Sequence, residues 1–85
     1  MEQITYGSLF TFLQQLGFRD SSRTEFERVF KHTERDIVFA FSMLDDPSVD
    51  RHVRAADILS VEFRLQQEAL ISGGLAESSM RLSGL

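Results

Sequence analysis

Two strand-like runs joined by a short polar sequence most constrain the fold of this chain. In residues 26–32, FERVFKH, Phe26 and Phe30 fall on one face, as the period of two of a strand requires. Residues 36–43, DIVFAFSM, hold a run of apolar positions that are mostly β-branched or aromatic, which is typical of a central strand covered on one or both faces. The polar TERD sequence between them suits a tight turn, so we predict a hairpin.

A helix is predicted before this hairpin, over residues 5–17. Its leucines recur at spacings of four and three, and neighbouring phenylalanines widen the apolar stripe. Thr5 is a suitable N-cap because its hydroxyl can accept a hydrogen bond from the first turn. Gly17 is well placed to end the helix in the left-handed conformation.

A second helix is predicted after the hairpin, from Ala55 to about Ile71, and Gly73 and Gly74 should end it. Its apolar arc is wider than one small sheet can cover, so part of it should face the first helix or a partner chain. The apolar positions form two adjacent stripes, one of Ile58, Val61, Leu65 and Ala69 and the other of Leu59, Phe63 and Leu70.

These elements predict an α+β fold of two layers, α-β-β-(β)-α, with a small antiparallel sheet and two helices packed on one face. The polar residues 19–24 should form an exposed connection, and Arg51 to Val53 is either a short third strand or the entry to the second helix. With 85 residues the chain has room for one domain, predicted at residues 1–72, followed by a flexible tail at 73–85. Its core should include Leu13, Phe30, Phe39, Ile58 and Leu65.

Composition limits the chemistry. The chain has no cysteine and two histidines, His32 and His52, and lacks the spaced motifs of metal and nucleotide sites. We therefore predict no metal, no cofactor and no catalytic residue. No apolar run approaches the length of a membrane span, so we expect a cytoplasmic protein without membrane contact.

The chain has a net charge of −4, but basic residues are concentrated in one segment of it, which we call the basic strip. Arg19, Arg23, Arg28 and Lys31 are concentrated in the predicted connection and first strand, where they could contact phosphates. Of these, Arg23, Arg28 and Lys31, together with His32 at the strand end, are the candidate RNA contacts. Acidic residues alternate with these basic residues in the sequence, so we predict that any contact with RNA is weak.

The second apolar stripe of the last helix is the candidate partner interface. If the first helix leaves Leu59, Phe63 and Leu70 uncovered, these side chains should bind a protein partner, most simply a copy of the same chain. The alternative is that the two helices cover each other.

The chain resembles the HicA-like (YcfA-like) family of small toxin-type proteins over residues 5 to about 72. Three segments carry the resemblance: the helix ending LGF at residues 16–18, the strand ending VFKH at residues 29–32, and the last helix, which contains the sequences ILSV and LIS. It implies an α-β-β-β-α fold similar to a double-stranded RNA-binding domain. Active members are ribonucleases that act on mRNA and are neutralised by an antitoxin. Their essential histidine lies in a Gly-Ser-His context on the first strand, where this chain reads TEFER at residues 24–28.

Without that histidine, the favoured prediction is a non-catalytic HicA-like domain that acts through protein contact or weak RNA contact. Two alternatives stay open. One is a toxin-type mRNA endoribonuclease with a displaced active site, and the other is a structural subunit that forms a homodimer through its last helix.

Overall fold

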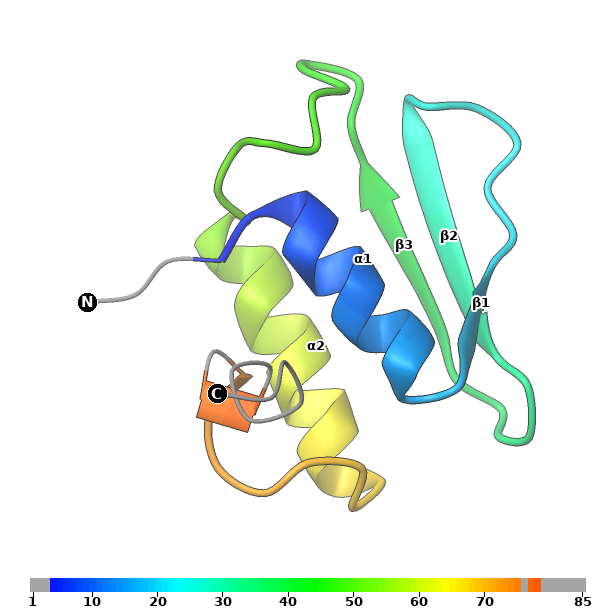
Figure 1. Cartoon of the computed structure of the whole chain (residues 1–85), viewed down its shortest axis with the longest axis vertical. Coiled ribbons are helices and arrows are strands. Elements are labelled where there is room, and N and C mark those ends of the chain that lie inside the picture. Colours follow the sequence, from blue (N-terminus) through cyan, green and yellow to red (C-terminus); the bar gives the residue numbers. More distant parts are fainter. Residues whose placement is uncertain (1–3, 76, 79–85) are drawn as a thin grey trace.

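The computed structural model describes residues 4–75, 77 and 78, and it has the predicted α+β architecture (Figure 1). A three-stranded antiparallel sheet in the order β1-β2-β3 lies between two helices in the sequence, and both helices lie on the same side of it. Neither helix of this described part is long and apolar enough to cross a membrane. The elements are α1 (Tyr6–Gln15), β1 (Phe18–Asp20), β2 (Glu27–His32), β3 (Val38–Ser42) and α2 (Ala55–Gln67).

Helix α1 begins and ends at the residues that the sequence indicated. Thr5 is the N-cap, and its side-chain oxygen accepts a hydrogen bond from the backbone of Ser8, whose hydroxyl contacts the Thr5 backbone in return. This reciprocal capping box satisfies donors that the first turn leaves unpaired. Gly17 follows the helix with φ of 103°, a left-handed conformation in which a side chain would be strained.

The predicted hairpin is confirmed as β2 and β3. They pair antiparallel with Phe30 opposite Phe39, and the TERD sequence forms the bend between them. Burial alternates along β3, where Phe39 and Phe41 are buried and Val38 and Ala40 are exposed. Among the described residues, the sheet is therefore covered on one face, and its other face is open.

The third strand is found at a different place from the one we predicted. Phe18–Asp20 forms β1 and pairs with β2, whereas residues 19–24 were predicted to be entirely a connection. Arg51–Val53 contains only an isolated bridge, from His52 to Thr5. A strand of three residues is too short to show a period in sequence. β1 forms because the chain reverses direction at Gly17 and then runs beside β2, with which it pairs.

The core gathers side chains from all of these elements. Leu13, Phe30, Phe39 and Leu65 are buried as predicted, whereas Ile58 is partly buried at the edge of the same cluster. At its centre the Phe30 ring stacks on a ring of α1 at a centroid distance of 4.7 Å. The core members are Tyr6, Leu9, Phe10, Phe12, Leu13, Phe18, Phe30, Ile37, Phe39, Phe41, Met43, Val53, Val61, Leu65 and Leu75.

The packed part of the chain extends beyond the predicted domain end at residue 72. Leu75 is 1% exposed and belongs to the core, so the predicted tail at 73–85 begins with residues that pack on the domain. Residues 76 and 79–85 of that predicted tail lie outside the described residues.

Helix α2 ends earlier than predicted, at Gln67 in place of Ile71. Ala69 has φ of 58°, a left-handed conformation that closes the helix through hydrogen bonds from its own N–H and that of Leu70 to preceding carbonyls. Glycine is the usual residue at this position, because a Cβ is strained there. Ala69 and Leu70 therefore do not continue the apolar stripes of α2.

The conformation of Ala69 predicts a stabilising substitution. Ala69→Gly should raise the free energy of unfolding by about 0.5–1 kcal/mol, because it relieves the strain of a left-handed alanine. In a thermal melt this corresponds to an increase of roughly 2–8 °C for a domain of this size. The matched control is Ala56→Gly inside α2, which should lower stability. An equal loss of stability in both variants would contradict the assignment of the helix end.

Candidate functional site

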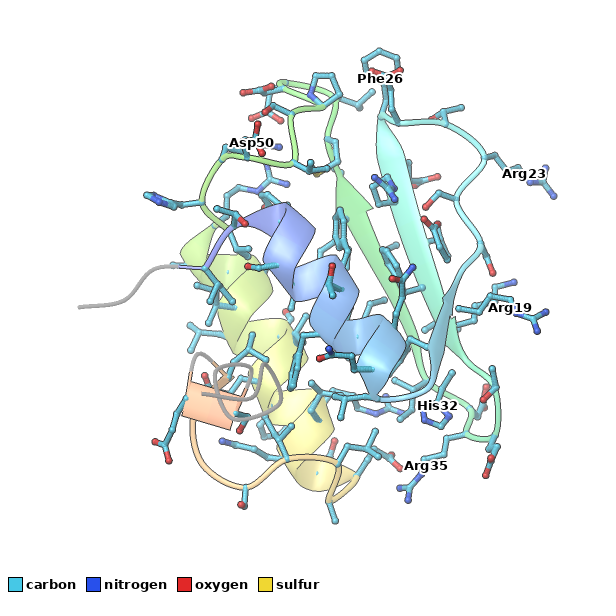
Figure 2. The ribbon with its side chains drawn as sticks, viewed as in Figure 1. Arg19, Arg23, Phe26, His32, Arg35 and Asp50 are labelled. Carbon is cyan, nitrogen blue, oxygen red and sulfur yellow. The ribbon has the colours of Figure 1, made fainter. Side chains whose placement is uncertain are left out.

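The open face of the sheet carries the candidate site. Arg19 of β1 and Lys31 of β2 are cross-strand partners, and both side chains are exposed. Their strand neighbours Phe18 and Phe30 point the other way into the core. Figure 2 shows Arg19 and Arg23 projecting on the same side of the molecule, away from both helices.

Two adjoining shallow hollows mark this face, with volumes of about 460 and 240 Å³. We name the surface that they form together the β1–β2 groove. Ser21 and Lys31 line both hollows, which makes the groove continuous. Its lining residues are Arg19, Ser21, Arg23, Thr24, Glu27, Val29, Lys31, His32 and Thr33.

The cations of the groove have no ion-pair partner within the described part of the chain. Arg19, Arg23 and Lys31 form no salt bridge there. Glu27 is the one carboxylate among the lining residues, so the groove holds three positive charges against one negative charge. The remaining described arginines are all paired: Arg28 with Asp20, Arg35 with Glu68, Arg51 with Asp45, Arg54 with Asp45 and Asp57, and Arg64 with Glu68.

Arg28, a predicted RNA contact, does not lie with Arg23 and Lys31. It points to the helix side of the sheet, where its guanidinium lies 4.8 Å from the Phe10 ring centroid and 2.7 Å from the Asp20 carboxylate. Burial acts to raise the pKa of Asp20, but hydrogen bonds from Ser22 and Arg28 outweigh it and the pKa is lowered. The charge of Arg28 is thus balanced by Asp20 on the helix side of the sheet. The period of two already places Arg28 and Lys31 on opposite faces, a signal in the sequence that the predicted strip overlooked.

His32, the other predicted contact, is held by the protein's own backbone. Its Nδ1 accepts hydrogen bonds from the backbone N–H groups of Glu34 and Arg35, each at 3.1 Å. The proton of the ring is therefore on Nε2, which lies 3.0 Å from the carbonyl oxygen of Leu16 and donates to it. The ring joins the end of α1 to the β2–β3 turn, and both nitrogens are already engaged. His32 borders the groove as a structural residue.

The predicted partner-interface residues are divided by the end of α2. Leu59 and Phe63 lie one turn apart on this helix and are 66% and 65% exposed. Leu70 lies beyond the helix end and is partly buried against the core, so it does not join them. The apolar surface on α2 therefore consists of Leu59 and Phe63.

The described residues contain no group of three or more histidine or acidic side chains that could hold a metal ion. His52 is exposed in the loop before α2, and its backbone forms the bridge to Thr5. Comparisons with protein-family models, curated proteins and solved structures found no match to this chain.

Proposed function

We propose that this domain is a non-catalytic binding module that makes a weak contact with the phosphate backbone of RNA through the β1–β2 groove. The observation that carries the proposal is that Arg19, Arg23 and Lys31 lie together in the groove without ion-pair partners among the described residues.

The net charge of the whole chain is negative, whereas the charge of the groove is positive. The five paired arginines share four carboxylates of the same domain, so most of their charge is balanced locally and adds little to the field outside it. The groove keeps its positive charge and also offers the hydroxyl groups of Ser21, Thr24 and Thr33. Arginine, lysine and hydroxyl side chains are the usual contacts to phosphate oxygens.

The same composition limits the affinity and the specificity of the contact. Sequence-tolerant binding of single strands normally adds aromatic platforms on which bases stack, and the groove has no aromatic residue besides the engaged His32. Three cations should give a dissociation constant on the order of 10⁻⁴ M, at the weak end of non-specific binding. The logarithm of the binding constant should fall with the logarithm of salt concentration with a slope of about −2, since each contact to a single strand contributes about −0.7.

A binding role is favoured over the ribonuclease alternative by the state of His32. A general base needs a ring nitrogen that can reach the proton of a substrate, and both nitrogens of His32 are engaged with backbone groups. No observation in the groove supports a displaced active site.

The test is a titration of a short fluorescently labelled single-stranded RNA, followed by anisotropy at several salt concentrations. Arg19→Gln, Arg23→Gln and Lys31→Gln should each weaken binding about fivefold at 0.1 M salt and reduce the slope by about 0.7. Arg35→Gln is the matched control, because this arginine is also exposed but lies outside the groove and pairs with Glu68. Equal weakening in the control variant would contradict the proposal, and shortened RNA products that require His32 would restore the ribonuclease alternative.

A further inference from the structure

Phe26 is an exposed aromatic side chain at one end of the β1–β2 groove. Six of the eight phenylalanines of the chain are buried in the core, whereas Phe26 is 44% exposed. It lies at the tip of the turn between Thr24 and Glu27, which form a bridge to each other and both line the groove. Figure 2 shows Phe26 projecting past the end of β2, farther along the molecule than Arg19 and Arg23. The ring therefore lies next to the groove without lining it.

The backbone of Phe26 is fixed by hydrogen bonds on both sides. Its N–H donates to the Thr24 side-chain oxygen at 3.2 Å, and its carbonyl oxygen accepts from the N–H of Met43 at 2.8 Å. Met43 follows β3 and is fully buried, so the turn is attached to the core of the domain. A fixed backbone loses little conformational entropy when a ligand binds. The exposed ring is therefore presented from a preorganised position.

The charges around Phe26 favour a base over a phosphate at this end of the groove. Glu25 and Glu27 flank Phe26 in the sequence, and both side chains are exposed. Their carboxylates repel a phosphate, whereas the three unpaired cations attract phosphates along the rest of the groove. A nucleotide chain that follows the groove would place its phosphates on the cations and a base at Phe26.

We propose that Phe26 stacks on an unpaired base of the RNA whose phosphates contact the groove, so that the ligand of the groove is a single strand. This inference rests on the proposed function. Stacking of bases on aromatic side chains is the usual contact of proteins that bind single strands without sequence preference, because every base has a π-face. A base inside a duplex is already stacked on both faces by its neighbours, so it offers no face to this ring. Phe26 thus supplies the aromatic contact that the groove itself lacks.

Anisotropy titrations with labelled oligoadenylate and with a labelled RNA duplex of the same length test the stacking. Phe26→Ala should weaken the binding of oligoadenylate about fivefold or more, which is the usual effect of removing one stacked aromatic side chain. The salt slope should not change, because the ring carries no charge. The affinity for the duplex should also not change. Phe63→Ala is the control, since this phenylalanine is also exposed but lies on α2, and it should bind both RNAs as the wild type does.

A tryptophan at position 26 gives a direct signal of stacking. The chain contains no tryptophan, so the fluorescence of Phe26→Trp comes from this position alone. Oligoadenylate should quench that fluorescence, whereas an abasic oligonucleotide of the same length, which carries phosphates but no bases, should not. Phe63→Trp is the matched control, and neither oligonucleotide should quench it.

The outcomes separate this inference from the proposed function. Salt-dependent binding of oligoadenylate that Phe26→Ala leaves unchanged would overturn the stacking, while the phosphate contact through the groove would stand. Equal weakening of oligoadenylate and duplex binding by Phe26→Ala would also overturn it, because the ring would then not act on an unpaired base. A wild-type chain that binds neither RNA at low salt would overturn the proposed function and this inference together.

Discussion

Replacing Phe30 with alanine should lower the free energy of unfolding by about 3–5 kcal/mol. This side chain is 0% exposed, stacks on Phe10 and lies opposite Phe39 in the sheet. Truncating a buried phenylalanine costs about 3–5 kcal/mol, because the transfer free energy is lost and a cavity remains. An 85-residue domain has a total stability of roughly 4–13 kcal/mol. The expected loss is therefore a large part of the whole.

The matched control for this experiment is Phe26→Ala. Phe26 lies four residues earlier but is 44% exposed at the start of the hairpin, so its truncation should cost less than about 1 kcal/mol. Urea unfolding followed by circular dichroism measures both variants. If Phe30→Ala unfolds at the urea concentration of the wild type, the placement of Phe30 at the centre of the core is wrong.

The parts of the fold that the sequence predicts are those with local signals. The β2–β3 hairpin follows from two apolar patterns and the short turn between them, and α1 follows from its leucine spacing and its caps. β1 could not be predicted in this way, because Phe18–Asp20 contains one apolar residue and no period. Its pairing depends on where the turn at Gly17 directs the chain, which is tertiary information.

The end of α2 shows a different limit. Ala69 and Leu70 fit the apolar period of the helix, and alanine is a strong helix former, so sequence alone favours continuation. The helix nevertheless ends at Gln67, because Leu70 and Ile71 turn back and pack against the core. Burial of these side chains outweighs the small strain at Ala69, and propensity gives way to tertiary packing.

The candidate site was predicted in part. Arg23 and Lys31 line the groove as expected, and Arg19, which the sequence placed in the basic strip, completes it. The salt bridge of Arg28 joins β2 to Asp20 of β1, the strand that the sequence did not predict. That Arg28 lies on the opposite face from Lys31 could be predicted, because the period of two along β2 separates them.

Replacing His32 with alanine should lower the free energy of unfolding by about 2–3 kcal/mol. The change removes a hydrogen bond to the Leu16 carbonyl and two from the backbone N–H groups of Glu34 and Arg35. Each such bond contributes about 0.5–1.5 kcal/mol. The loss also includes the edge-to-face contact of the ring with Phe18, at a centroid distance of 4.9 Å.

The control for His32→Ala is His52→Ala, which removes the other, exposed imidazole and should change stability by less than about 0.5 kcal/mol. Urea unfolding gives the stability of both variants, and the RNA titration is repeated where His32→Ala is still folded. Because both ring nitrogens are engaged within the protein, the folded variant should bind RNA as the wild type does, with the same salt slope. A variant that keeps its stability but loses RNA affinity would show that His32 contacts the ligand, as the sequence first suggested.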